Sequence, residues 1–272
     1  MISALLIFVV IKSADAKPKK RVEVQSHGLS IMVTDVTTNT VLRGQNVDQI
    51  RGLASMTKLM TAMVALDHDL NTSRKLQLSK LAGSKIPKRE YTRGELFHML
   101  LIKSDNAAAE TLAEDYPGGR MKFIRDMNIR AEMMGMYGTH FDDPSGLSSG
   151  NVSTASDVTQ MVIAAGYYPQ IRNISTKKQT QILTQVKRKE RVLVLHNTNT
   201  AILSQVDGIQ LSKTGFTNPA GFCVALLVEK MINDEIHHQV IVVMGARNPA
   251  QRVDTVKKVA YNAKTGGVYV TS

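Results

Sequence analysis

Segments with the pattern of β-strands lie at both ends of this 272-residue chain, and segments with the pattern of helices lie between them. Near the start, an apolar strand is expected at Leu29–Asp35, followed by a turn and a return strand that begins at Val41. Near the end, strands are expected at Ile209–Ser212, Phe222–Glu229 and Gln239–Met244. This order predicts an α/β (α+β) fold, in which both chain ends supply one antiparallel sheet, flanked by helices and carrying a mostly helical insert.

The strongest helical pattern covers Ser55–Asp67, where the apolar face is wide enough to predict a central, well-buried helix. Further helices are expected at Leu96–Ile102, Ala107–Ala113, Asp157–Ala165 and from Pro249 to about Ala263. The length allows one large domain. We therefore expect a single domain at 28–264, with a sheet region at 28–66 plus 205–264 and a helical region at 67–204.

The first residues resemble a secretory signal peptide. Residues 2–11 are almost wholly apolar, and Ala14-Asp15-Ala16 places small residues at a cleavage site, so a signal peptide is expected at 1–16 and a basic linker at 17–27. No Lys or Arg precedes the apolar run, so either the free N-terminus supplies the charge or the true start lies upstream. The run is shorter than the ~20 residues that span a bilayer. A secreted or periplasmic protein without a stable membrane anchor is expected; the alternative is an apolar N-terminal helix of the fold.

The net charge of the chain is 34 − 23 = +11, which favours association with polyanions. No nucleic-acid-binding motif accompanies the charge, so a nucleic-acid partner is not expected. Cys223 is the only cysteine and lies in an apolar segment, which predicts a buried, inert thiol. HExxH, zinc-ligand, GxGxxG and P-loop patterns are absent, so neither a metal nor another cofactor is expected.

Three short patterns contain candidate nucleophilic serines. Ser55 and Lys58 form a Ser-x-x-Lys pair at the start of the apolar helix, where both side chains share one face. A second pair, Ser175 and Lys178, lies in a polar stretch that is expected at the surface. The segment 146–150 matches Gly-x-Ser-x-Gly but lacks the apolar strand that a nucleophile elbow requires before it. These contexts favour Ser55.

A lysine can take the proton of a serine only if its pKa falls well below ~10.4. Burial and a second cation both lower the pKa of a lysine. The central helix would bury Lys58, and Lys213-Thr214-Gly215 at the end of a strand offers the second cation. Gly215 would let a substrate lie close to that strand. Lys264–Gly266 repeats this tripeptide but is interpreted as a helix stop.

Ser104-Asp105-Asn106 lies between two expected helices, and its ordinary interpretation is a helix N-cap. Its position between the Ser-x-x-Lys and Lys-Thr-Gly patterns favours a place in the same site.

With these three motifs, the chain resembles the low-molecular-mass penicillin-binding proteins, and most closely their penicillin-binding protein 7 type D-alanyl-D-alanine endopeptidases. The resemblance covers roughly 28–250 and implies a serine β-lactamase/DD-peptidase-like fold. The segments that carry it are 54–63, 104–109, 116–119, 143–147, 151–155, 197–199 and 210–218.

The resemblance implies a role for each matched residue. Ser55 would attack a D-alanyl peptide carbonyl, with neutral Lys58 as base, and Ser104 would pass the proton to the leaving amine. Asn106 would bind the acyl-donor strand, and Lys213, Thr214 and Gly215 would bind the substrate. The backbone N–H groups of Ser55 and Phe216 would form the oxyanion hole. Arg247 would lie near a substrate carboxylate. Peptidoglycan peptides would be the substrates, with β-lactams as covalent inhibitors.

Other functions stay open at this level. The chain ends soon after its last expected helix, which favours a soluble endopeptidase over a membrane-tethered D-alanyl-D-alanine carboxypeptidase. A class A-like β-lactamase would need a Glu-x-x-Leu-Asn motif, which is missing from 139–145. A wall-binding module without activity would lack catalytic residues, whereas all of them are present here.

Overall fold

The computed structural model describes residues 28–186, 189–262 and 269–270. The expected signal peptide (1–16), the basic linker (17–27) and the helix stop at Lys264–Gly266 lie outside the described residues.

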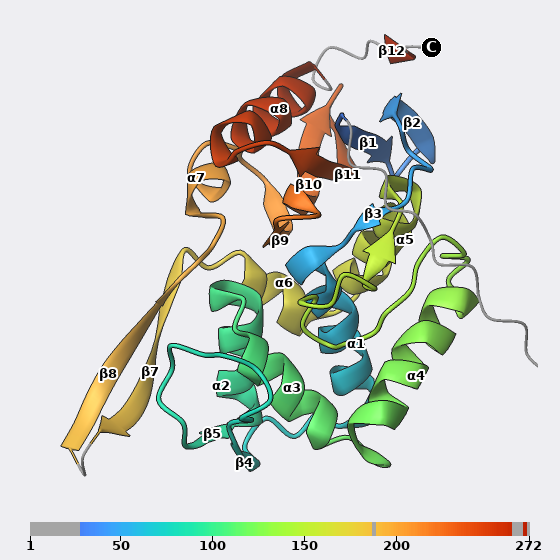
Figure 1. Ribbon diagram of the computed structural model, residues 1–272. Helices are drawn as coiled ribbons and strands as arrows, with labels where there is room; N and C mark the ends of the chain where they lie inside the picture. The colour runs from blue at the N-terminus through green and yellow to red at the C-terminus, as the bar shows by residue number, and fades with distance from the viewer. Residues whose placement is uncertain (1–27, 187–188, 263–268, 271–272) are drawn as a thin grey trace, which may run out of the picture.

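Strands from both chain ends form one six-stranded sheet, in the order β12-β2-β1-β11-β10-β9 (Figure 1). Neighbouring strands are antiparallel, except for the short parallel pair β12–β2. The strands are β1 (Ser30–Asp35), β2 (Thr40–Gln45), β9 (Ile209–Thr217), β10 (Gly221–Ile232), β11 (Glu235–Ala246) and β12 (Tyr269–Val270). The predicted sheet is confirmed. A turn at Asn233–Asp234 joins β10 to β11, and both of its residues have the positive φ of a two-residue hairpin.

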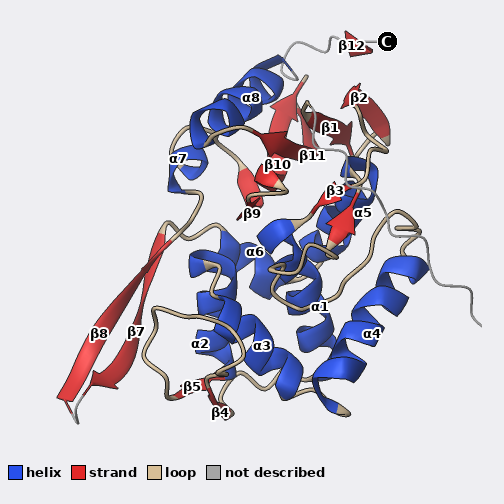
Figure 2. Cartoon of the chain, viewed as in Figure 1, coloured by secondary structure: helices blue, strands red, loops and turns tan. Residues whose placement is uncertain are grey.

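The sheet separates two hydrophobic cores because alternate side chains of a strand point to opposite faces. In β11, Val240 and Val242 belong to the larger core, whereas Ile241 and Val243 belong to the smaller one. Helix α8 (Pro249–Asn262) covers the smaller core, and α1 (Lys58–His68) and α5 (Ala155–Gly166) cover the larger one (Figure 2).

The helical region lies against the larger core. Besides α1 and α5, its elements are α2 (Arg93–His98), the π-helical turn η2 (Met99–Lys103), α3 (Asn106–Glu114), α4 (Gly119–Met133) and α6 (Pro169–Ser175). Helix α7 (Thr200–Leu203) packs elsewhere, because its buried Ile202 belongs to the smaller core. The expected helix at Leu96–Ile102 is therefore divided between α2 and η2. Helix α4 was not predicted, because its buried residues Phe123, Met127 and Ala131 form a narrow stripe among charged ones.

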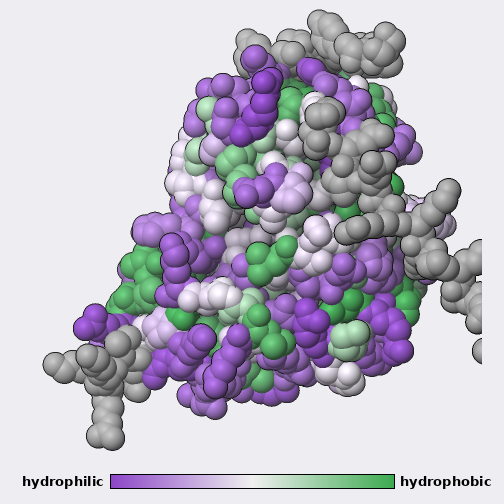
Figure 3. Space-filling model, in the orientation of Figure 1, coloured by the Kyte–Doolittle hydropathy of each residue, from purple (hydrophilic) through white to green (hydrophobic). Residues whose placement is uncertain are grey.

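Three two-stranded sheets complete the fold: β3 (Arg51–Gly52) with β6 (Val152–Ser153), β4 (Lys75–Gln77) with β5 (Glu90–Thr92), and β7 (Gln179–Val186) with β8 (Lys189–His196). The β7–β8 hairpin extends from the body and carries a hydrophobic patch (Figures 1 and 3). Its inner face buries Ile182 and Leu195, whereas Leu183 and Val192 are exposed on the outer face. No strand was predicted here.

Within the described residues, no helix has both the length and the hydropathy needed to cross a membrane.

Candidate active site

Ser55 lies in η1 (Ala54–Thr57), a 3-10 turn that leads directly into α1. The first nine residues of α1, from Lys58 to Leu66, are all buried, so the predicted central helix is confirmed. One turn after Ser55, the Nζ atom of Lys58 lies 2.9 Å from the Ser55 Oγ atom. The Ser-x-x-Lys spacing therefore brings the two side chains into contact, as the sequence predicts.

Lys58 has two further neighbours, and both can only accept hydrogen bonds. Its Nζ atom lies 2.7 Å from Asn106 Oδ1 and 2.5 Å from the main-chain oxygen of Ser145. A neutral amine has two N–H groups and one lone pair. If the N–H groups are donated to these two oxygens, the lone pair faces Ser55, the remaining neighbour that carries a proton. In this arrangement a neutral Lys58 would be oriented to accept the Ser55 proton.

Burial lowers the pKa of Lys58 to about 7. The carboxylates of Asp143, Asp105 and Glu110 oppose this shift, because each favours the charged lysine. From the sequence, Lys213 was also expected to lower the pKa of Lys58, as a second nearby cation. The causes of the Lys58 shift do not include Lys213, so this contribution stays a prediction. Conversely, burial, Lys58 and Arg252 hold the pKa of Lys213 well below its usual range.

The Ser104–Asn106 turn performs two tasks at once. Asp105 caps α3, because its Oδ1 atom accepts the backbone N–H of Ala108 at 2.9 Å. Ser104, in the left-handed conformation with φ 60°, accepts a hydrogen bond from Lys213 Nζ at 2.9 Å. The capping interpretation is thus right for Asp105, while Ser104 and Asn106 each contact a buried lysine.

Strand β9 forms the opposite wall of the site. The Lys213 side chain is buried, and its Nζ atom also donates to the main-chain oxygen of Thr214 at 2.8 Å. The Thr214 hydroxyl lies 2.6 Å from that of Thr198. Phe216 is 49% exposed and stacks on Phe222, with ring centroids 4.1 Å apart.

Gly215 allows η1 to approach β9 closely, while the predicted approach of a substrate to this strand stays a prediction. A Cβ atom at this position would lie 2.9 Å from the Leu53 oxygen and 3.1 Å from the Ser55 nitrogen. The neighbour that Gly215 admits is therefore η1 itself. Arg247 follows the end of β11 and is exposed. The side-chain hydrogen bonds that join Ser55, Lys58 and Asn106, and Ser104 with Lys213, do not include its guanidinium.

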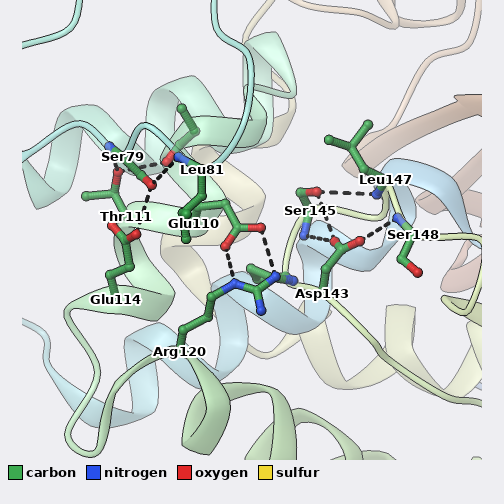
Figure 4. Close-up of polar contacts among 12 residues, drawn as sticks. Ser79, Leu81, Glu110, Thr111, Glu114, Arg120, Asp143, Ser145, Leu147 and Ser148 are labelled. Carbon is green, nitrogen blue, oxygen red and sulfur yellow. Dashed lines mark hydrogen bonds and ion pairs between the residues drawn. The ribbon is translucent and has the colours of Figure 1, made fainter.

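From the sequence, the loop 143–148 was recognised only through the segment 143–147 of the resemblance. The Asp143 carboxylate accepts hydrogen bonds from the backbone N–H groups of Ser145, Gly146 and Ser148, at 2.6, 2.6 and 2.5 Å, and from the Ser145 hydroxyl at 2.9 Å (Figure 4). These bonds hold the loop in the shape that presents the Ser145 oxygen to Lys58. The Asp-Pro-Ser-Gly sequence was the available signal, but it does not say what the turn touches.

An ion pair and an amide side chain support the same region. Glu110 on α3 is buried and binds Arg120 on α4, with 2.6 Å between Oε2 and Nε (Figure 4). The Asn151 Nδ2 atom donates to the main-chain oxygen of Asp143 at 2.9 Å and to the Thr57 hydroxyl at 3.1 Å. The loop is thereby tied to the helix that carries the candidate base.

The alternative serines occupy structural positions. Ser175 is fully buried, and its hydroxyl accepts a hydrogen bond from the Ser212 N–H at 3.2 Å. The prediction that Ser175 lies at the surface was therefore wrong, whereas Lys178 is exposed, as predicted. The reason is that α6 packs on β9, which the local polarity did not reveal. Cys223 is buried as predicted, and burial raises its pKa to about 11.

Among the described residues, no group of three or more His, Cys, Asp or Glu side chains could hold a metal ion. The arrangement around Ser55 is that expected of a serine hydrolase, with a buried lysine beside the candidate nucleophile. The sheet-and-helix arrangement is the DD-peptidase fold, as the structural neighbours below show.

Comparison with known proteins places the chain in a family. The family model described as D-alanyl-D-alanine carboxypeptidase (peptidase S11) matches residues 14–248, and the chain belongs to this family. It is 38% identical to a D-alanyl-D-alanine endopeptidase of Escherichia coli K12, over 83% of this chain and 74% of the relative. It is 37% identical to a D-alanyl-D-alanine endopeptidase of Pseudomonas aeruginosa, over 79% and 72% of the two chains.

Solved structures agree with this assignment. The Streptomyces K15 DD-transpeptidase superposes with a TM-score of 0.78 at 26% identity, covering 87% of this chain and 96% of that one. Penicillin-binding protein D2 of Listeria monocytogenes, in its ampicillin-bound form, gives a TM-score of 0.72 at 28% identity, covering 85% and 94%. The predicted family, fold class and serine hydrolase activity are confirmed.

Proposed function

We propose that this protein is a secreted serine D,D-peptidase that hydrolyses D-alanyl peptide bonds in peptidoglycan cross-links through an acyl-enzyme on Ser55. The observation that carries the proposal is the position of Lys58, whose Nζ atom has two acceptor oxygens and the Ser55 hydroxyl as neighbours. The endopeptidase names of the E. coli and P. aeruginosa relatives favour cleavage of cross-links.

In acylation, the Ser55 proton moves to neutral Lys58 as Oγ bonds to the D-alanyl carbonyl carbon. The carbonyl oxygen becomes an oxyanion, which the backbone N–H groups of Ser55 and Phe216 bind. Loss of one such donor typically costs 10²–10³ in rate. When the C–N bond breaks, Ser104, hydrogen-bonded to Lys213, gives its proton to the leaving amine and is reprotonated from the lysines. Water then hydrolyses the ester and restores Ser55.

The same walls would position the substrate. Asn106 would hydrogen-bond the acyl-donor strand, which would lie beside β9 at Thr214, Gly215 and Phe216. Arg247 would meet a substrate carboxylate at the end of β11. β-Lactams would acylate Ser55 as substrate mimics, and the ampicillin-bound state of the L. monocytogenes relative supports this.

The predicted signal peptide and the family of the chain favour a periplasmic or secreted location and a role in cell-wall remodelling. The predicted domain bounds, 28–264, contain every residue to which this mechanism assigns a role.

The first experiment is the intact mass of the mature protein before and after penicillin, beside the Ser55→Ala variant. We expect a lasting adduct of one equivalent that the variant lacks. Intact penicillin without an adduct would contradict the proposed chemistry. Consumption of penicillin without a lasting adduct would indicate a β-lactamase instead.

A further inference from the structure

Two exposed lysines lie on either side of the turn that carries Ser104. Lys103 is the last residue of η2 and immediately precedes Ser104. Lys85 follows Ser84, whose hydroxyl donates to Asp105 Oδ2 at 2.5 Å and so ties its loop to the turn. Chain connectivity and one side-chain hydrogen bond therefore place the main chain of both lysines at the edge of the candidate site, and both side chains are exposed there.

Two more exposed lysines, Lys177 and Lys178, lie between α6 and β7. Their main-chain oxygens each accept a hydrogen bond from Asn197 at 2.9 Å. The next residue, Thr198, donates its N–H to the Ile102 oxygen at 3.1 Å and contacts the Thr214 hydroxyl. Thr198 thus links the neighbour of Lys103 in η2 to β9, and Asn197 joins Lys177 and Lys178 to the same place. We refer to Lys85, Lys103, Lys177 and Lys178 as the cationic rim.

The charge of the rim has no partner within the described residues, where no ion pair involves any of its four lysines. The nearest carboxylate along the chain, Asp105, is buried and occupied as the cap of α3. The helical region does pair other cations, for example Arg93 with Asp115 and Arg120 with Glu110. The four lysines therefore add positive charge without an ion-pair partner at this edge of the site.

We propose that the cationic rim binds carboxylates of an acidic peptide substrate and so selects stem peptides whose internal carboxyl groups are free over stems in which they are amidated. This inference rests on the proposed function, because it assigns the rim to the substrate of the same site. Exposed lysine–carboxylate pairs are each worth about a twofold to fivefold change in binding. Several together give a usable preference, and the attraction also speeds encounter.

The test uses two synthetic cross-linked stem peptides that differ only in free or amidated internal carboxyl groups. Each is used at low salt as a competitor of penicillin acylation at Ser55, which requires no turnover of the peptide. The readout is the ratio of the two inhibition constants within one protein, so any effect on penicillin itself cancels. We expect the free-carboxylate peptide to compete about fivefold to tenfold better. The preference falls to about twofold or less in 0.5 M salt, where the screening length is roughly 4 Å.

The double variant Lys85→Gln/Lys103→Gln should reduce the same ratio to about twofold. Lys257→Gln/Lys258→Gln on α8 removes the same charge from two exposed lysines beyond the sheet and should leave the ratio unchanged. Equal competition by both peptides in the unmodified protein, an unchanged ratio in the rim variant, or an equal loss in the α8 variant would overturn the proposal.

The adduct separates this proposal from the proposed function. If penicillin acylates Ser55 but neither peptide slows it, the rim proposal is wrong while the acyl-enzyme stands. If no adduct forms, the proposed function fails, and direct calorimetric titration of the two peptides decides the rim proposal by the same ratio and the same variants.

Discussion

At the scale of single residues, the state of Lys58 depends on groups far from it in sequence. Burial favours its neutral form, and the carboxylates of Asp143, Asp105 and Glu110 favour its charged form. The pKa of Lys58 is about 7, and only the neutral lysine can accept the Ser55 proton. The rate of acylation should therefore fall about tenfold per pH unit well below pH 7.

Asp143→Asn tests this balance. The variant keeps an oxygen acceptor for the loop 143–148 but removes a negative charge near Lys58, so the pKa of Lys58 falls further. The midpoint of the pH–rate profile for penicillin acylation should move to lower pH. Asp142→Asn, a neighbouring exposed carboxylate that is absent from the causes of the Lys58 shift, is the matched control and should leave the midpoint in place. A midpoint that stays or rises in Asp143→Asn contradicts the assignment.

At the scale of elements, η1 packs closely between the loop 143–148 and β9, because Gly146 and Gly215 have no side chain on the sides that face it. A Cβ atom on Gly146 would lie 1.9 Å from the Ala54 oxygen, and Gly146 also has a φ of +82°. Ala54 itself has a positive φ of 46°, so the turn before Ser55 is constrained from both sides.

We therefore expect Gly146→Ala to displace η1, reducing penicillin acylation by about 10² or more and destabilising the fold by about 1–3 kcal/mol. Gly83→Ala is the control, because a Cβ atom there meets nothing within 4 Å and the backbone needs no positive φ. Acylation kinetics and urea unfolding measure the two effects. Equal behaviour of both variants would show that the close packing against Ala54 does not position Ser55.

At the scale of the whole molecule, two buried lysines couple folding to pH. Lys58 titrates at about 7 when folded and near its ordinary value of 10.5 when unfolded. Between these values the unfolded chain binds more protons, so stability rises with pH. From pH 7 to pH 9, Lys58 alone contributes roughly 2 kcal/mol, which corresponds to several degrees in Tm.

Thermal unfolding at both pH values should show this rise in the unmodified protein and a smaller rise in Lys58→Met, which cannot titrate. An equal rise in both proteins would exclude Lys58 as its source. The window stops at pH 9 because the pKa of Tyr116, raised to about 12, and that of Cys223, raised to about 11, give the opposite slope at higher pH.

Local patterns were sufficient for the features that depend on neighbours in sequence. The three-residue spacing of Ser55 and Lys58 gives contact on any helix, and period-two alternation identifies the strands of the sheet. Asp105 follows the ordinary preference for helix caps. Helix α4 and the β7–β8 hairpin were missed because their polar composition hides the few side chains that they bury.

The sequence by itself determined the family, the fold class and the three motifs, because these depend on residue type, order and short spacings. Only the tertiary structure decided what surrounds Lys58. The Ser145 oxygen that binds it is 87 residues away along the chain, and Asn106 is 48 away. Only the tertiary structure likewise shows that the buried Ser175 hydroxyl accepts a hydrogen bond from Ser212 in β9 and that Lys58 lowers the pKa of Lys213. Burial and Coulomb interaction depend on distance in space, and no local pattern in the chain contains that distance.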